Sequence, residues 1–354
     1  MGARVVGPDP QLTESLSRCY SRHSHDKLTL RTPVESEMNK RIVLWSPLDD
    51  YLAGILGALS EIDYVRVNSE AELAGELPAA DALVLPGILY SASVAKLIRE
   101  RANRLDWIQL TTAGFDGIIF HGVPASIVVT NAGKVHGPLI AEHALTLLTA
   151  ATRRLPLFLA HQSNNQWNRK IALPLTTLED AAVAVLGFGS IGREIAKRLK
   201  AFGARVIAID RTIWSDELAD EFLASSQLHD ALSKADALVV AASLTPESKG
   251  LIDGAAINSL RRGSILVNVG RGAIVDTMAV ANALNEGRLA GAALDVTDPE
   301  PLPSDHPLWS CPNAIITPHV SPFGSPAVRR RYSELLRDNI TRFLAGEQLA
   351  HRVA

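Results

Sequence analysis

The 354-residue sequence has little cysteine, no marked excess of charge of either sign and no long apolar run. Two cysteines, Cys19 and Cys311, are too few for a disulfide framework, so we expect the reducing cytoplasm as the location. The 35 basic and 38 acidic residues are well mixed, which does not predict nucleic acid or an anionic membrane as a partner. No apolar stretch approaches the ~18 residues of a membrane span. These absences favour a cytoplasmic protein with neither of those partners.

The first forty residues differ from the rest of the chain. They are polar, carry scattered charges and show neither helical nor strand periodicity. We therefore expect residues 1–40 to form a disordered or loosely attached extension. Cys19, His23 and His25 lack a fourth ligand at zinc-finger spacing, and we expect no metal site.

After residue 40, short apolar segments alternate with helical ones in two series, over residues 42–111 and 181–316. This alternation predicts an α/β fold with two Rossmann-like domains, each a doubly wound parallel sheet. A long alanine- and leucine-rich helix, Pro138 to Leu155, lies between the series. A final helix, Pro326 to Ala345, is expected to pack back on the first domain. The first domain is thus discontinuous (41–130 and 319–354), with the second (131–318) inserted.

A glycine motif opens the second series, between an apolar strand (182–186) and a helix-compatible stretch. Gly187 permits a tight turn, Gly189 lets a pyrophosphate approach the backbone, and Gly192 lets the helix lie close to the strand. Asp210, at the end of the next strand, would accept hydrogen bonds from the adenosine ribose. An ordinary glycine loop is the alternative, but the flanking strands and the acid favour a binding site for NAD.

Beyond Met38 the chain resembles the D-isomer-specific 2-hydroxyacid dehydrogenases, which include glyoxylate/hydroxypyruvate reductases, phosphoglycerate dehydrogenases and the C-terminal-binding corepressors. The matching segments, in the family's order, are Asn131-Ala132-Gly133 with Ala141-Glu142-His143-Ala144, the glycine motif, Leu244-Thr245-Pro246-Glu247, Val267-Asn268-Val269-Gly270-Arg271-Gly272, Asp295-Val296 with Glu300-Pro301-Leu302-Pro303, and Thr317-Pro318-His319. The resemblance implies an NAD-dependent oxidoreductase that interconverts 2-oxo and D-2-hydroxy acids as a homodimer.

The resemblance also implies further site residues. The cofactor would contact Ser190, Ile191, Thr245 and Val269, and Asp295 would contact the nicotinamide carboxamide. The substrate carboxylate would meet backbone N–H groups of Thr112, Ala113 and Gly114. A simple turn would place the same glycine at this position, so the sequence alone leaves both interpretations open.

The chemistry of such a reaction identifies three catalytic candidates. Hydride reduction of a 2-oxo acid needs a cation to hold the carboxylate and an acid to protonate the new alkoxide. Arg271 suits the first role through its planar donor fork, although a surface arginine in a turn is the alternative. His319 suits the second role, and Glu300, otherwise a plain loop acid, would orient the ring and favour its protonated form. His136, His143 and His161 are instead expected in helix caps, core packing or the domain junction.

The substrate is expected to be small, with an uncharged R group. The loop from Leu85 to Tyr90 offers apolar side chains and one phenol where phosphoglycerate dehydrogenases carry a basic loop, and Phe115 and Phe323 are candidate aromatic walls. Because the sequence ends 35 residues after His319, we expect no regulatory domain. The alternative function is an NADH-sensing interaction protein like the corepressors, which keep much the same residues. An inactive scaffold is a third interpretation, against which the catalytic trio argues.

Overall fold

The computed structural model describes residues 39–46, 50–172, 176–323 and 325–354. The expected N-terminal extension, with Cys19, His23 and His25, therefore lies outside the described residues except for its last two positions. Lys40, the second of these, already begins the first strand. Lys40–Ala354 form one compact unit.

Five parallel strands form the first sheet, in the order β2-β1-β3-β4-β5. The strands are β1 (Lys40–Leu44), β2 (Ile62–Arg66), β3 (Ala82–Leu85), β4 (Trp107–Leu110) and β5 (Val128–Thr130). The helices between them are α1 (Asp50–Leu56), α2 (Glu70–Glu76), α3 (Ala92–Arg101) and α4 (Asp116–His121). Strand order reverses direction between β1 and β3, and open α/β sheets bind ligands beyond the carboxyl ends of their strands at such a point.

Seven parallel strands form the second sheet, in the order β12-β11-β10-β9-β6-β7-β8. They are β6 (Ala182–Leu186), β7 (Arg205–Asp210), β8 (Glu221–Ala224), β9 (Ala237–Val240), β10 (Ser264–Asn268), β11 (Leu289–Leu294) and β12 (Ala314–Ile316). The associated helices are α5 (Gly137–Thr152), α6 (Leu155–Ser163), α7 (Ser190–Ala201), α8 (Leu228–Ser233), α9 (Gly254–Ser259) and α10 (Thr277–Asn285). The predicted class, two doubly wound parallel sheets, is confirmed.

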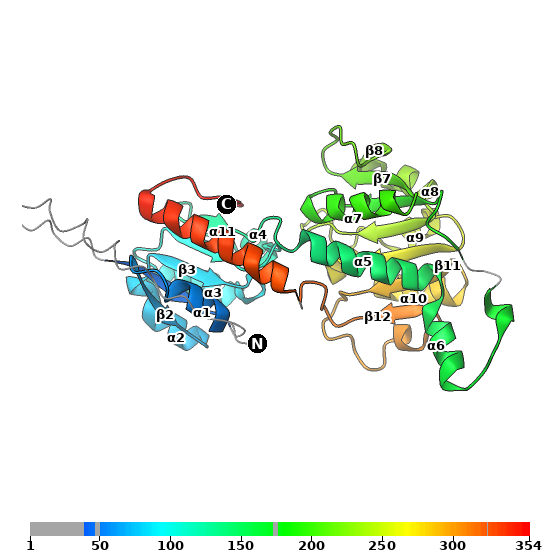
Figure 1. Ribbon diagram of the computed structural model, residues 1–354, viewed down its shortest axis with the longest axis horizontal. Coiled ribbons are helices and arrows are strands. Elements are labelled where there is room, and N and C mark those ends of the chain that lie inside the picture. The colour runs from blue at the N-terminus through cyan, green and yellow to red at the C-terminus, as the bar shows by residue number, and fades with distance from the viewer. Residues whose placement is uncertain (1–38, 47–49, 173–175, 324) are drawn as a thin grey trace, which may run out of the picture. The chain divides into compact units, whose positions relative to one another are not determined.

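Helices cover both faces of the second sheet (Figure 1). Side chains alternate along β6, so that Val183 and Val185 join the core under α5 and α7, whereas Ala184 and Leu186 join the core under α8, α9 and α10. The strand order reverses between β6 and β9, where Leu186 pairs with Val240. The carboxyl ends of these two strands therefore lie side by side and define the edge at which a ligand is expected.

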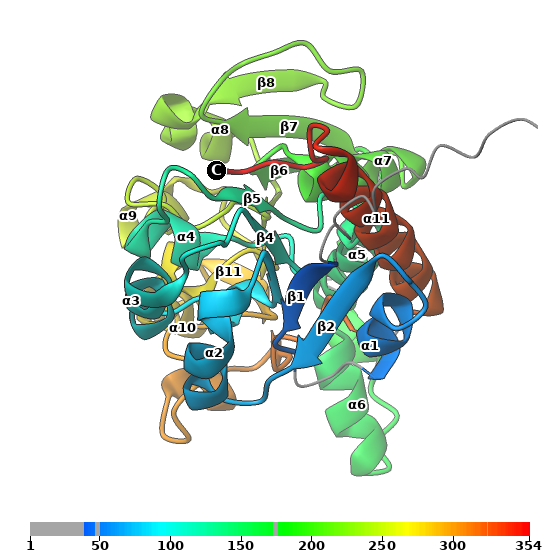
Figure 2. The ribbon, with the colours of Figure 1, turned by 90° about the vertical axis from the view of Figure 1, so that its left-hand side faces the viewer.

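Helix α11 (Pro326–Ala345) returns to the first sheet, with the bounds that the sequence predicts. Its apolar stripe of Val328, Tyr332, Leu336 and Ile340 shares a core with Ile42, Leu44 and Trp107. Figures 1 and 2 both show α11 beside α1. The segment after α11 then pairs with β5: Val353 donates its amide to the Val129 carbonyl at 2.8 Å, and Val129 donates its amide to the Ala354 carbonyl at 2.9 Å.

Two local expectations need correction. The helix predicted from Pro138 to Leu155 is interrupted, because Arg154 adopts a positive φ of 53° that separates α5 from α6. The two predicted series are also incomplete: α4, β5 and α6 lie between them, and the second series contains a strand, β8, that its apolar segments do not predict. Within the described ranges, no helix has both the length and the apolar character that crossing a bilayer would require.

Candidate active site

The glycine motif forms the turn between β6 and α7. Gly187 has a φ of 89°, and a Cβ there would collide with Ala242 just beyond β9. A Cβ on Gly192 would collide with the carbonyl oxygen of Gly187, so the helix can lie this close only without a side chain. Gly189 has no atom within 4 Å of its Cβ position. The turn is thus closed on two sides and open at Gly189, beside the first amides of α7 at Ser190 and Ile191, as an approaching diphosphate requires.

The remaining cofactor candidates lie at the same carboxyl edge of the second sheet. At the end of β7, the Asp210 carboxylate accepts the amides of Phe188 and Arg211, each at 2.7 Å. Val269 follows β10 and donates its amide to Val240 at 3.0 Å. Thr245 follows β9 and donates its amide to the Ser248 hydroxyl at 2.8 Å. The structure therefore brings together residues that are spread over more than eighty positions of the sequence.

Arg271 is held by the turn that follows β10. The buried Asn268 side chain donates to the Arg271 carbonyl and accepts the Gly270 amide, both at 3.0 Å. The guanidinium donates from Nε to Oδ2 of Asp116 at 2.6 Å and from Nη1 to the Gly270 carbonyl at 2.8 Å. Its Nη2 lies against Gly114, where a Cβ would collide with it. Arg271 and the predicted substrate loop are therefore in direct contact.

Side chains fix the backbone of that substrate loop. The Thr112 hydroxyl donates to the Gly114 carbonyl at 2.9 Å and accepts the Gly87 amide at 3.0 Å. Asn131 donates to the Ala113 carbonyl at 2.8 Å. These bonds hold Thr112, Ala113 and Gly114 in one conformation beyond the carboxyl end of β4.

His319 and Glu300 are paired as the sequence predicts. Nδ1 of His319 lies 3.0 Å from Oε2 of Glu300, whose other oxygen accepts the Thr297 amide at 3.2 Å. His319 has a left-handed backbone, with φ of 52°, and its amide donates to the Asp295 carbonyl at 2.7 Å. A histidine in this strained conformation must be held by its surroundings. The pairing through Nδ1 leaves Nε2 available to a substrate.

Asp295 braces the turn that carries His319. Its carboxylate is 1% exposed and accepts the Thr317 hydroxyl at 2.6 Å and the amides of Val320 and Ser321 at 3.0 and 3.1 Å. Burial raises the pKa of this carboxyl, but these hydrogen bonds outweigh burial and keep the pKa below its ordinary value. Asp295 is therefore an anion at neutral pH with most of its acceptor capacity used by the turn.

Two residues of the site make contacts that the sequence does not predict. His143, on α5, places Nε2 3.1 Å from the Thr317 hydroxyl and 3.3 Å from Oδ1 of Asp295. Asp116 pairs with Arg271 across 155 positions. His143 lies in a segment that carries the family resemblance and is expected in a helix cap, core packing or the domain junction. Asp116 lies two positions after the predicted substrate loop. Only the fold reveals their partners. His136 and His161 belong to no such cluster: His136 occupies the N-cap position of α5 without a side-chain hydrogen bond to the helix, and His161 contacts Gln166.

The predicted apolar loop needs one correction. The Tyr90 phenol does not face a substrate: the side chain is 2% exposed, its hydroxyl donates to the Gly122 carbonyl at 2.8 Å, and burial raises its pKa to about 12. Leu85 is also buried, and Phe115 packs on the first-sheet core. Ile88, 79% exposed, and Phe323, 58% exposed, remain as apolar groups that a substrate could meet.

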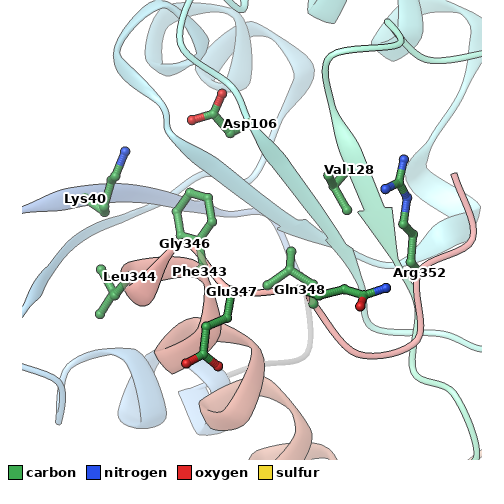
Figure 3. Close-up of a pocket in the computed structure, with 10 residues that line it drawn as sticks. Lys40, Asp106, Val128, Phe343, Leu344, Gly346, Glu347, Gln348 and Arg352 are labelled. Carbon is green, nitrogen blue, oxygen red and sulfur yellow. The ribbon is translucent and has the colours of Figure 1, made fainter.

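A separate pocket of about 450 Å³ lies near the amino ends of the first sheet's strands (Figure 3). Lys40 begins β1 and Val128 begins β5, while Phe343 and Arg352 come from α11 and the segment after it. The pocket contains none of the predicted site residues. It lies at the opposite edge from the one at which parallel sheets bind ligands.

Two proteins of known name are similar to the chain over most of its length. A glyoxylate reductase from Thermofilum pendens is 32% identical over 285 residues, which cover 79% of this chain and 83% of the relative. A D-3-phosphoglycerate dehydrogenase from Mycobacterium tuberculosis is 32% identical over 299 residues, which cover 82% of this chain and 54% of the relative. The chain thus spans about half the length of the phosphoglycerate dehydrogenases that it matches.

A solved structure and a family model agree with these relatives. The probable 2-hydroxyacid dehydrogenase from Rhizobium etli, in complex with NADP, HEPES and L(+)-tartaric acid, superposes with a TM-score of 0.76 at 25% identity, covering 89% of this chain and 98% of the other. Residues 145–321 match the NAD binding domain of the D-isomer specific 2-hydroxyacid dehydrogenases. The chain belongs to this family of NAD(P)-dependent oxidoreductases.

Proposed function

We propose that the protein reduces small 2-oxo acids to D-2-hydroxy acids with NADH, using Arg271, Glu300 and His319 as catalytic residues. The observation that carries the proposal is the contact of 3.0 Å between His319 and Glu300, together with Arg271 against the Thr112–Gly114 loop. These groups supply what the reaction needs besides hydride, namely a cation, an acid and a partner for that acid.

The cofactor would lie along the carboxyl edge of the second sheet and supply the hydride. The open position at Gly189 fits a diphosphate on the amino end of α7, and Asp210 lies where ribose hydroxyls would meet it. The full proposed set is Gly187, Gly189, Ser190, Ile191, Gly192, Asp210, Thr245, Val269 and Asp295. Since Asp295 already braces the His319 turn, its carboxylate would support cofactor and acid together.

The residues divide the chemistry as follows. Arg271 and the backbone of Thr112, Ala113 and Gly114 hold the substrate carboxylate and orient the carbonyl. His319 donates its Nε2 proton to the carbonyl oxygen as that oxygen becomes an alkoxide, and Glu300 orients the ring through its contact with Nδ1. The neutral ring then regains a proton from solvent, so that 2-oxo acid, NADH and H⁺ give D-2-hydroxy acid and NAD⁺.

The proposal includes an arrangement of domains. Residues 41–130 and 319–354 would bind substrate and residues 131–318 would bind NAD, in a homodimer located in the cytoplasm. The packing of α11 on the first sheet supports the discontinuous boundary. The exposed apolar side chains of α6 support an interface between two copies of the chain, because in a monomer these side chains would remain in contact with water.

The deciding experiment follows NADH absorbance with the purified protein and a panel of 2-oxo acids. We expect turnover with at least one of glyoxylate, hydroxypyruvate and short aliphatic 2-oxo acids, and a D-configured product. Binding of NADH without turnover of any panel member would contradict the proposal. That outcome would favour a cofactor-sensing interaction protein instead.

A further inference from the structure

Asp116 connects the turn after β4 with the turn after β10. It is the first residue of α4, and its Oδ2 accepts the Nε hydrogen of Arg271 at 2.6 Å. The side chain of Asp116 is 23% exposed and that of Arg271 is 31% exposed, so solvent screens the attraction between their charges only partly. Oδ1 of Asp116 is buried and has no hydrogen-bond partner among the described residues. A buried carboxylate oxygen without a donor is costly, and the nearby guanidinium charge offsets that cost.

The pairing determines which part of Arg271 can reach a ligand. Nε is bound by Asp116 and Nη1 by the Gly270 carbonyl. Nη2 lies beside the substrate loop at Gly114. Since a guanidinium is planar, fixing Nε and Nη1 fixes the direction of the Nη2 hydrogens as well. Without Asp116, the cation would remain but the plane could rotate.

We propose that Asp116 is a positioning residue: it sets the guanidinium plane of Arg271 and moderates its positive charge, so that a bound 2-oxo acid is held in the orientation that hydride transfer requires. This inference rests on the proposed function. It predicts that loss of Asp116 lowers kcat more than it weakens substrate binding. A rotated Arg271 still attracts the substrate carboxylate but leaves the carbonyl at the wrong angle for hydride transfer.

Kinetics of Asp116→Ala and Asp116→Asn test this role, with oxamate as an unreactive analogue of a 2-oxo acid. We expect Asp116→Ala to lower kcat by about tenfold or more, while the inhibition constant of oxamate and the affinity for NADH change by less than about twofold. Asp116→Asn keeps an oxygen that can accept from Nε, and should recover at least about fivefold of the lost kcat. A merely structural role would instead weaken oxamate binding and turnover together.

Two further variants sharpen the comparison. Gly114→Ala places a methyl group where Nη2 lies and displaces the guanidinium, so oxamate binding and kcat should both fall. Asp253→Ala removes another acid at a helix start, which caps α9 through the Ala256 amide. This control should lose stability and keep its kcat. The inference is overturned if Asp116→Ala retains full kcat, if it loses oxamate binding in parallel, or if Asp116→Asn is as slow as Asp116→Ala.

A measurement independent of turnover separates this inference from the proposed function. Phenylglyoxal modifies accessible guanidinium groups, and mass spectrometry of the peptide that contains Arg271 gives the rate at that residue. We expect Asp116→Ala to raise this rate several-fold over the wild-type protein, with Asp116→Asn between them. An unchanged rate contradicts the inference even in an active enzyme. A wild-type protein that shows the expected rates and reduces no 2-oxo acid contradicts the proposed function alone.

Discussion

His319 and Glu300, which are 19 positions apart in the sequence, meet at 3.0 Å between Nδ1 and a carboxylate oxygen. The contact determines which ring nitrogen is available, because an Nδ1 that faces a carboxylate carries hydrogen and directs Nε2 outward. Glu300 is held in turn through the Thr297 amide, and His319 through the Asp295 carbonyl. Both partners are therefore fixed to the backbone of the same region, so that one rigid turn presents the proposed acid.

Replacing His319 tests the proposed acid. His319→Ala removes the ring that is paired with Glu300 and therefore the proposed proton donor. The variant should lower kcat by roughly 100-fold or more and leave NADH binding nearly unchanged. Steady-state kinetics and fluorescence titration with NADH give the two quantities. His229→Ala serves as the control, since that exposed ring lies on α8 and contacts the Ser259 hydroxyl at the end of α9, at 2.8 Å. Full turnover by His319→Ala would remove His319 from the mechanism.

Asp210 predicts a preference for NADH. Its carboxylate is fixed by the amides of Phe188 and Arg211 at the end of β7, where the additional phosphate of NADPH would approach it. Repulsion between the two anions should make kcat/KM higher for NADH, although Arg211 offsets part of the effect. Parallel kinetics with both cofactors measure the ratio. A higher kcat/KM with NADPH would show that the attraction of Arg211 for the additional phosphate outweighs the repulsion by Asp210. The Rhizobium etli structure contains NADP.

The exposed apolar surface of α6 predicts a dimer. No residue of α6 is buried, Leu155 and Leu159 are 45% and 52% exposed, and Trp167 just beyond the helix is 89% exposed. Light scattering at micromolar concentration should give twice the chain mass of 38.0 kDa. Leu159→Asp should shift the protein toward monomer, whereas Met278→Asp, at another exposed apolar position, should not. A wild-type monomer would contradict the proposed assembly.

The substrate loop predicts discrimination against phosphorylated acids. The turn at Gly87 lies close to the Gly114 carbonyl, and the next residue, Ile88, exposes its apolar side chain there. Desolvating a phosphate group beside Ile88 would be costly. We expect glyoxylate, hydroxypyruvate or a short aliphatic 2-oxo acid to be reduced at least roughly tenfold more efficiently than 3-phosphohydroxypyruvate, a gap of ~1.4 kcal/mol. Ile88→Arg should reduce this difference in kcat/KM between the unphosphorylated and the phosphorylated substrates. Equal efficiencies in the wild type would contradict this prediction.

His136 predicts a loss of stability in mild acid. Burial, assisted by the charge of Arg331, lowers the pKa of this histidine from 6.5 to about 4. Between these values the unfolded chain binds a proton that the folded protein does not, so stability is complete above pH 6.5 and falls as the pH decreases toward 4. The contribution is at most ~3 kcal/mol.

Urea unfolding of the wild type and of His136→Gln at pH 7.5 and 5.0 measures this effect. The variant, which has no ring to protonate, should lose less stability on acidification than the wild type. His161→Gln, which replaces a half-buried histidine that contacts Gln166, should behave like the wild type. Equal losses in all three proteins would show that His136 is not responsible.

The sequence predicts what depends on local order. Alternating apolar segments predict two parallel sheets, and the helix Pro326–Ala345 is recovered with its bounds because Pro326 starts it and Gly346 ends it. The strand β8 is missed because it begins with a charged residue and only one of its four residues is buried, whereas the predicted strand β9 has the same length and is apolar and buried throughout. The break at Arg154 is missed because nothing in the residue type requires a positive φ.

The site follows the same division. His319 and Glu300 are predicted together because motif and spacing name both. The Asp116–Arg271 and His143–Asp295 contacts depend on how distant segments meet, which periodicity does not encode. The orientation of Tyr90 is a further case, since a short helical turn after β3 decides whether the phenol faces the core or a ligand.

The position of α11 has a consequence for synthesis on the ribosome. The second sheet is complete once Ile316 has emerged, whereas one face of the first sheet awaits Tyr332, Leu336 and Ile340. During translation, the part of the chain made first should therefore be among the last to gain a finished core, with Ile42 and Leu44 accessible to chaperones until the final helix leaves the exit tunnel. Stalled chains ending before Pro326 should be cut by protease within the first sheet and protected within the second. Equal protection of both sheets in such chains would refute this order of folding.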